Sequence, residues 1–268
     1  MSTTTSTALE VAELRDLDEL RRACELFVTI WGRSDVGAPV VPELLRAISH
    51  AGGYVAGARD KGELVGASMG FLGRDADGPI LHSHITGVHP SHQGRGVGLT
   101  LKRHQQRWAA EHGIDVITWT FDPLVRRNGR FNLTSLGAIG TEYLCDFYGE
   151  MDDALNRSDP TDRLVARLTV DAREREEPDL TELQGRGAEI VLAASSSGQP
   201  EVAPSKAAVR LALVPEDIVA IRGSDPGLSL AWRTASREAM GNAIADGLRA
   251  LRVTRDGWYV FAENEEAL

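Results

Sequence analysis

A glycine-rich stretch, VHPSHQGRGVG at residues 88–98, decides how the rest of the chain is interpreted. It joins a strand predicted over 81–88 to a helix predicted over 96–112, and its three glycines stand at alternate positions. Several backbone N–H groups can then point into one concavity at the start of the helix. Such donors bind a phosphate or pyrophosphate, because unpaired N–H groups and the helix dipole both favour negative charge. The stretch therefore predicts an anion site.

Two nucleotide-binding motifs also contain glycines after a strand, and neither fits this stretch. The dinucleotide fingerprint Gly-x-Gly-x-x-Gly has its first glycine tight against the strand end. Here the third glycine comes one residue early, and residues 89–93 separate the strand from the turn. The Gly-Lys-Ser/Thr ending of a nucleoside-triphosphate loop is also missing.

The elements around the stretch are predicted from hydrophobic periodicity and from capping residues. We expect a helix opened by Asp16 and ended by Gly32, and a second helix opened by Pro42. A hairpin over 54–72, the strand 81–88, the helix 96–112 and a strand over 115–121 follow. In this reading two helices precede any strand.

The remainder of the chain predicts a second unit. A strand over 163–170 is followed by the charge run 171–178, which we interpret as a solvated linker. Strands over 189–194 and 207–214, a helix capped by Asp225 and a hairpin over 251–261 come next. We expect domains at 1–170 and 188–268, with a linker at 171–187.

Composition narrows the function classes. The chain has 268 residues, 42% hydrophobic and 25% charged, with 29 Lys and Arg against 39 Asp and Glu. A net charge of −10 argues against nucleic acid as a partner and favours cationic or neutral small substrates. Residues 1–8 lack a leader pattern and no run is long enough to span a membrane, so we expect a cytoplasmic protein. Cys24 and Cys145 are expected to be reduced, core-filling residues.

Three residues of the glycine-rich stretch carry a resemblance to a known family. Gln93, Gly96 and Gly98 match Gln/Arg-x-x-Gly-x-Gly/Ala, and residues 88–90 match a Val-x-Pro ending of the preceding strand. The chain therefore resembles the GNAT superfamily of acyltransferases, and most of its length resembles a longer, little-characterised group within it. The resemblance implies an α/β (α+β) fold with a mixed, mostly antiparallel central sheet flanked by helices. It also implies acetyl-CoA or another acyl-CoA as cosubstrate, with no metal.

The resemblance assigns cofactor contacts by position. Loop backbone amides would hold the pyrophosphate of CoA, and the strand edge at Gly87 and Val88 would pair with the pantetheine arm. Asn128 would also contact the cofactor. Arg95, Lys102 and Arg103 are available for the 3′-phosphate, or they form a solvated helix face. The loop residues in question are Gln93, Gly94, Arg95, Gly96, Val97, Gly98 and Leu99.

The chain departs from the family at the proton donor. The family often places a tyrosine three residues before a Leu-Gly pair, which is Leu136 and Gly137 here, and that position is Leu133. The leaving thiolate would then take its proton from Tyr143, Tyr148 or water.

Histidines supply the candidate bases. His82 and His84 lie two apart on the predicted strand and project from the same face, where either can accept the proton of an amine, directly or through water. His84 is the first choice because it lies nearer the cofactor end. Both histidines can instead line the sheet. Glu142 and Glu150 are alternative bases. His89 and His92 invite a zinc interpretation, which we reject because no ligand spacing accompanies them.

These features predict an N-acyltransferase, with acetyl-CoA as donor and the primary amine of a small molecule such as an amino acid as acceptor. Transfer of succinyl or another acyl group is the alternative, which Arg126 and Arg127 would suit as a carboxylate clamp or leave as solvated loop charges. A non-catalytic acyl-CoA-binding or regulatory module is the alternative from another class. The C-terminal unit, whose helix and strand resemble a degenerate half of the GNAT fold, would complete the sheet, cover the substrate channel or form a homodimer.

Overall fold

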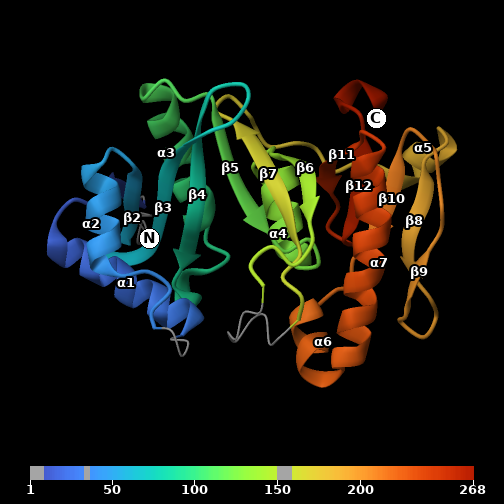
Figure 1. The fold of residues 1–268 in the computed structure, drawn as a ribbon, viewed down its shortest axis with the longest axis horizontal. Coiled ribbons are helices and arrows are strands. Elements are labelled where there is room, and N and C mark those ends of the chain that lie inside the picture. Colours follow the sequence, from blue (N-terminus) through green and yellow to red (C-terminus); the bar gives the residue numbers. More distant parts are fainter. Residues whose placement is uncertain (1–8, 33–36, 150–158) are drawn as a thin grey trace, which may run out of the picture. The chain divides into compact units, whose positions relative to one another are not determined.

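The computed structural model describes residues 9–32, 37–149 and 159–268 (Figure 1). The chain divides into two compact units, residues 1–118 and 119–268. The boundary falls inside strand β5 (Val116–Phe121), so the units share one strand of the chain. Each unit is described by itself below.

The first unit is an antiparallel meander that ends in one parallel pair. Its strands run in the order β1-β2-β3-β4-β5, antiparallel up to β4, and β4 then pairs in parallel with β5. Its elements in chain order are β1 (Glu10–Glu13), α1 (Leu17–Trp31), α2 (Pro42–His50), β2 (Tyr54–Asp60), β3 (Glu63–Arg74), β4 (Pro79–Val88), the short 3-10 turn η1 (Pro90–His92), α3 (Val97–Glu111) and the start of β5.

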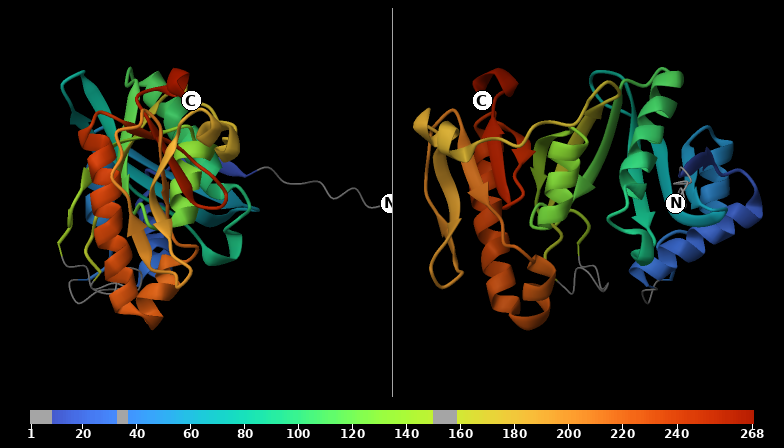
Figure 2. Two further views of the ribbon diagram at one scale, coloured as in Figure 1. Left: turned by 90° about the vertical axis from the view of Figure 1, so that its right-hand side faces the viewer. Right: turned by 180° about the vertical axis from the view of Figure 1, so that it is seen from behind.

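Helices cover both faces of this sheet. The α1 helix begins where the Asp16 side chain accepts from the N–H groups of Asp18 and Glu19, and it ends at Gly32. Together α1 and α2 bury an apolar cluster against one sheet face, and α3 packs on the other face through Val97 and Leu101 (Figures 1 and 2). Burial of these apolar faces is what holds the unit together.

The prediction that two helices precede any strand was wrong. Residues Glu10–Glu13 form the edge strand β1, which pairs antiparallel with β2 from Glu10–Arg59 to Glu13–Ala56. A four-residue strand gives too short an alternation to be seen in the sequence, since only its pairing with β2 defines it.

The second unit adds a seven-stranded sheet in the order β7-β6-β11-β12-β10-β8-β9. Neighbouring strands are antiparallel except β10 and β8, which are parallel. The long helix α7 lies on one face, and α4 with the π-helical segment η2 lies on the other (Figures 1 and 2). The elements after β5 are α4 (Arg126–Arg130), η2 (Phe131–Ser135), β6 (Ile139–Leu144), β7 (Arg163–Thr169), α5 (Leu180–Gly185), β8 (Glu189–Ala194), β9 (Pro200–Val202), β10 (Arg210–Leu213), α6 (Ile218–Ser224), α7 (Pro226–Ala245), β11 (Arg249–Val253), β12 (Trp258–Ala262) and η3 (Glu265–Ala267).

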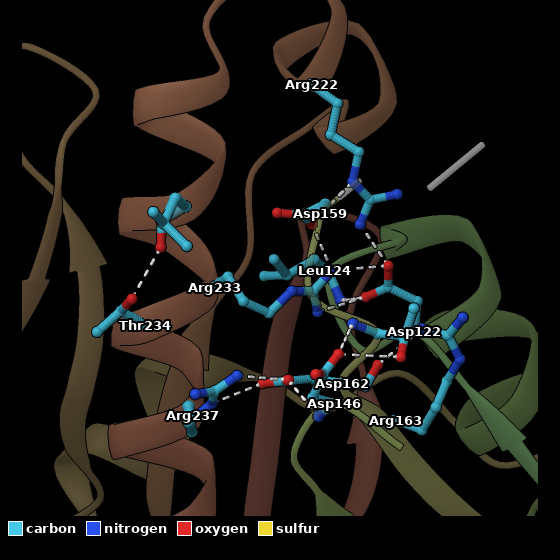
Figure 3. A network of polar contacts seen from close by, with 12 residues as sticks. Asp122, Leu124, Asp146, Asp159, Asp162, Arg163, Arg222, Arg233, Thr234 and Arg237 are labelled. Carbon is cyan, nitrogen blue, oxygen red and sulfur yellow. Dashed lines mark hydrogen bonds and ion pairs between the residues drawn. The ribbon is translucent and has the colours of Figure 1, made fainter. Parts of the chain in front are cut away.

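A buried ionic cluster fastens α6 and α7 to the end of β5 (Figure 3). Arg233 donates from both terminal nitrogens to the Asp122 carboxylate, each at 2.9 Å, and also pairs with Asp159 at 2.9 Å. Arg222 pairs with Asp122 and, at 3.0 Å, with Asp159. None of the four side chains is more than 9% exposed, so we call these four residues the buried ion cluster.

The segment 171–187 is more ordered than the predicted solvated linker. It contains α5, and the Arg175 guanidinium donates to the backbone carbonyls of Leu133 (3.3 Å), Ala138 (2.7 Å) and Leu251 (3.0 Å). The prediction that the charge run is solvated was therefore wrong at Arg175. Composition could not reveal these acceptors, because they come from residues 37 to 76 positions away.

The predicted fold class is confirmed, since the units combine mostly antiparallel sheets with flanking helices. One residue assignment was wrong: Cys24 is buried as expected, but Cys145 is exposed at the end of β6 and fills no core. Within residues 9–32, 37–149 and 159–268, no helix is long and apolar enough to cross a membrane.

Candidate functional site

The glycine-rich stretch forms a tight, open turn between β4 and α3 in the first unit. The turn passes through η1, whose first residue follows His89, and the His89 ring accepts from the Ser91 N–H at 3.3 Å. Gly94 and Gly96 adopt φ values of +74° and +80°, a left-handed region that L side chains rarely adopt. A Cβ built at either glycine would meet nothing within 4 Å, so open space lies beside both.

The N-terminus of α3 faces this space without a capping side chain. Gly96 is the N-cap residue, and no side chain accepts from the first N–H groups of the helix. Val97 buries its side chain against the sheet, which leaves only its backbone for a ligand. Uncapped N–H groups at a helix start, beside an open glycine turn, fit an anionic group such as a pyrophosphate.

The residues expected at the CoA pyrophosphate and pantetheine thus lie together. Gly94, Arg95 and Gly96 are exposed, Gly98 and Leu99 are partly exposed, and exposed Gln93 donates to the Val88 carbonyl at 3.4 Å. Gly87 is buried on the α1 side, where a Cβ would come within 2.6 Å of Ile30.

Lys102 is not available for a 3′-phosphate and does not lie on a solvated helix face. It is only 4% exposed, and its Nζ donates to Ser83 Oγ at 2.8 Å and to Gln105 Oε1 at 3.2 Å. Burial lowers the pKa of Lys102 to about 7. The side chain therefore belongs to a polar cluster between α3 and β4, while Arg103 stays partly exposed on the helix.

The two candidate histidines lie on one face of β4, next to a β-bulge. Met69 pairs with Ile85 and Gly70 with Ser83, so His84 is the extra residue of β4 at the bulge. The His82 and His84 rings have centroids 6.4 Å apart, and both lie near the Phe71 ring. The prediction that they share a face is confirmed.

Both histidines are held in the form that can accept a proton. Burial lowers the pKa of His82, and the charges of His84 and Lys102 lower it further. Burial also lowers the pKa of His84. An imidazole with a pKa below its usual value is neutral at neutral pH and has a free ring nitrogen, as a general base requires.

Sequence reasoning missed the two residues that flank these rings. Phe71 is the cross-strand partner of His82 on β3, and Thr118 is its partner on β5, with Thr118 Oγ1 3.3 Å from His82 Nδ1. The strand register alone brings them to His82. An aromatic residue opposite a histidine could have indicated this contact, but the two residues can be matched only once the strand register is known.

Asn128 and Glu142 belong to the second unit. Asn128 is exposed in the short helix α4, and Glu142 is exposed on β6 opposite Val165. Neither residue is placed relative to the glycine turn, so their expected roles stay predictions. Glu150 lies outside the described residues.

Of the candidate proton donors, Tyr143 is engaged elsewhere. Its hydroxyl donates to Asp162 at 3.0 Å, and burial, followed by the Asp162 charge, raises its pKa. Asp162 is 0% exposed and pairs with Arg237 at 2.7 Å, so the tyrosine serves a structural carboxylate. The hydroxyl of Tyr148 is 2.9 Å from Thr120 Oγ1, and this side chain is 42% exposed.

Leu133 shows why the family tyrosine is missing. It is fully buried in η2, where α4 and η2 pack under β11. A phenol hydroxyl here would need a buried hydrogen-bond partner. Leu133 is part of the apolar core at this position.

Comparisons with known proteins agree with this reading of the first unit. The family model described as an acetyltransferase (GNAT) domain matches residues 3–122. No curated protein matches the chain.

Solved structures match part of this chain. A putative acetyltransferase from Salmonella typhimurium, solved with its cofactor acetyl-CoA, is 20% identical, with a TM-score of 0.49, and the match covers 65% of this chain and 99% of that one. The ribosomal-protein-S18-alanine N-acetyltransferase from Escherichia coli is 11% identical, with a TM-score of 0.45, over 65% of this chain and 98% of that one. An aminoglycoside acetyltransferase from an uncultured soil metagenomic sample is 19% identical, with a TM-score of 0.39, over 42% and 78%.

The glycine turn, the uncapped α3 terminus and the family match therefore lead to one conclusion: residues 3–122 form a GNAT acetyltransferase domain.

Proposed function

We propose that the chain transfers an acetyl group from acetyl-CoA to the primary amine of a small molecule such as an amino acid. The observation that carries the proposal is the position of His82 and His84. His82 is partly buried and His84 is exposed, and both have lowered pKa values and lie on β4, the same strand that leads into the glycine turn. One strand thus presents a base and continues into an anion site.

Each part of β4 and α3 has a role in this proposal. The α3 N-terminus and the glycine turn bind the pyrophosphate of acetyl-CoA, which supplies the activated acyl thioester. Neutral His84, with His82 beside it, accepts the proton of the amine as the amine attacks. A backbone N–H of β4 near Val88 donates to the oxygen that becomes negative in the transition state. Water returns a proton to the thiolate.

The register of β4 supports a role for its far end. Its parallel pairing with β5 joins Ile80–His82 to Val116–Thr118 and stops there. The backbone of residues 83–88 is therefore not paired with β5, and the pantetheine arm would pair with that side of the strand. The arm would follow the strand from His84 toward the glycine turn.

The first test is thiol release from acetyl-CoA and succinyl-CoA with a panel of amino acids and polyamines. The Gly96→Trp variant should lose turnover, because a bulky L residue at φ +80° distorts the turn and fills its open space. Gly198→Trp is the matched control, since Gly198 also has φ +80° and open space around it but lies in the second unit. Tight CoA binding without thiol release from any amine would contradict the proposal and favour a binding or regulatory module.

The pH dependence tests the assigned base. Because both histidine pKa values lie below 6.5, kcat/KM should rise with pH through a pKa below 6.5 and then reach a plateau. His84→Gln should lower kcat by about 100-fold to 10,000-fold, the usual contribution of a general base. A profile of the same shape in the His84→Gln and His82→Gln variants would remove both histidines from the mechanism.

Succinyl transfer remains the alternative within the enzymes. Arg126 is fixed by its own contacts, since its Nε donates to the Arg255 carbonyl at 2.8 Å, and Arg127 is exposed. A preference for succinyl-CoA that is lost in Arg127→Ala would favour this alternative. A cytoplasmic location and a homodimer are also part of the proposal.

A further inference from the structure

Four arginines line one hollow of the second unit. Its volume is about 480 Å³, within the range of about 300–1,000 Å³ that is usual for small-molecule pockets. Two carboxylates share the lining, so the formal charge of the six residues is +2 in a chain whose net charge is −10. The lining residues, which we call the arginine pocket, are Arg126, Arg127, Arg130, Glu216, Arg255 and Asp256.

The four arginines of the pocket come from two segments far apart in the sequence. Helix α4 supplies three of the arginines, and Arg126 and Arg130 are one helical turn apart. The turn between β11 and β12 supplies Arg255 and Asp256, and it is tied to α4 because Arg126 Nε donates to the Arg255 carbonyl at 2.8 Å. A Cβ at Gly257 in that turn would come within 3.0 Å of Arg126 Nε. The pocket wall is thus held in place.

A second contact joins β12 to the chain beside α4. Tyr259 on β12 donates its buried hydroxyl to the Pro123 carbonyl at 2.8 Å. The same hydroxyl leaves no room for a side chain at Gly129 of α4, where a Cβ would come within 2.2 Å of it. Positions fixed by packing and hydrogen bonds lower the entropic cost of binding a ligand.

Positive charge in the pocket is only partly balanced by the protein. Arg126 contacts Asp256 at 3.5 Å, and Arg130 contacts Glu177 at 3.4 Å. In the part of the chain that the structure describes, the Arg127 and Arg255 guanidinium groups have no acceptor, and the buried Arg130 Nε has none either. Grouped guanidinium charges repel one another, and a buried donor without an acceptor costs free energy, so an anion would relieve both.

We propose that the arginine pocket binds the oxyanion group, phosphate or carboxylate, of a small ligand. A guanidinium group donates two parallel hydrogen bonds to either group, which makes arginine suited to both. The carboxylate of Glu216 in the lining favours a ligand that also carries an amino or hydroxyl donor. The site lies within the second unit and does not depend on the acetyl-transfer proposal.

Calorimetric titration of the full chain with inorganic phosphate and, separately, with malonate tests the site and distinguishes the two oxyanions. Arg127→Ala/Arg255→Ala should bind the preferred probe at least tenfold more weakly than the wild type. The matched control is Arg186→Ala/Arg249→Ala, which removes two exposed arginines of the same unit and gives the same net charge. The control should stay within twofold of the wild type.

Titrations with and without saturating CoA separate this pocket from the glycine turn, which also favours anions. Binding that persists with CoA and is lost in the pocket variant supports the proposal. Equal affinities in the pocket and control variants, or no binding of either probe by the wild type, would overturn it. Binding that CoA removes and the pocket variant leaves unchanged would belong to the glycine turn, and would overturn it as well.

Discussion

The first unit buries a lysine beside neutral hydrogen-bonding groups, whereas the second unit buries carboxylates and guanidinium groups as pairs. At Lys102, desolvation dominates and lowers the pKa to about 7. At Asp122, burial would raise the pKa, but the attraction and hydrogen bonds of Arg233 and Arg222 outweigh it and lower the pKa to about 2. Burial alone therefore does not decide whether a group stays charged.

The difference fits the tasks of the two regions. The Lys102 amine lies behind β4, bonded to Ser83, and its charge reaches His82 on the other face of the strand. Its protonation can change near neutral pH, so the field at the candidate base can change too. In the buried ion cluster, Asp122 stays charged over the whole neutral range, and the cluster holds α6 and α7 in place. In the proposed mechanism the first region would adjust proton transfer, whereas the second maintains structure.

Removing a carboxylate from the buried ion cluster should have the largest effect. Asp122→Asn leaves Arg222 and Arg233 buried with one negative charge fewer, and breaking a buried pair in this way costs about 3–5 kcal/mol. Denaturant unfolding measures the loss. A cost no larger than that of a surface ion pair would mean that the cluster is solvated and that the comparison between the units fails.

Acid should weaken the same cluster. Because the folded pKa of Asp122 is below its usual 3.8, its contribution is present above about pH 4 and is lost as the pH falls through about 2. Asp122→Asn should therefore flatten the acid side of the stability profile. If the stability of the two proteins fell in the same way at low pH, other carboxylates would control the acid denaturation.

The next largest effect concerns Lys102, where stability again rises with pH but in the neutral to alkaline range. Its folded pKa of about 7 lies below its usual 10.5, so between these values the unfolded chain binds more protons and stability rises with pH. From pH 7 to 9 the wild type should gain roughly 2 kcal/mol relative to Lys102→Met. Urea unfolding at both pH values measures it, and parallel profiles in the two proteins would show that Lys102 remains charged in the fold.

A half-exposed pair in the second unit should give a smaller effect. Arg237 is 42% exposed and binds fully buried Asp162, which keeps the Tyr143 hydroxyl as a second donor. Arg237→Met should cost about 1–2 kcal/mol, because one donor to a buried carboxylate is lost while others remain. If this variant lost as much stability as Asp122→Asn, solvent exposure would not explain the difference in stability between the Arg237–Asp162 pair and the buried ion cluster.

The smallest effect is expected at the surface of the first unit. Arg21 and Asp18 on α1 contact at 2.7 Å with side chains 56% and 74% exposed. Arg21→Gln should change stability by no more than about 0.5 kcal/mol, since water screens the pair. The shift of the unfolding midpoint should lie near the error of the measurement, and a clear loss would require a contact beyond the Asp18 pair.

Local sequence signals predicted the elements that position the glycine turn. Periodicity and caps indicated α1, α2, β4, α3 and β5 because each of these elements buries a repeating apolar face. The turn itself was predicted because its glycines have a direct backbone meaning, which Gly94 and Gly96 confirm. The edge strand β1 and the short helix α5 were missed, since neither is long enough to show a period.

Residues that meet only through tertiary structure could not be predicted in the same way. Phe71 and Thr118 reach His82 through the strand register, which depends on a bulge that no local pattern reveals. The buried ion cluster joins Asp122 to Arg233, 111 positions later in the chain. Lys102 was expected on a surface because lysine usually lies there, yet Ser83 and Gln105 offer it two buried acceptors.

The contacts of the 171–178 segment determine where the chain can be cut. Arg175 donates to three carbonyls of the second unit. A Cβ at Gly137 would come within 2.0 Å of the Arg173 carbonyl oxygen, so the segment packs tightly there. A recombinant fragment ending at residue 170 would lack Arg175 and would leave the η2 and β11 carbonyls without their donor. A protease that nicked the segment would do the same. Although it reads as a linker, this stretch belongs inside any fragment meant to fold.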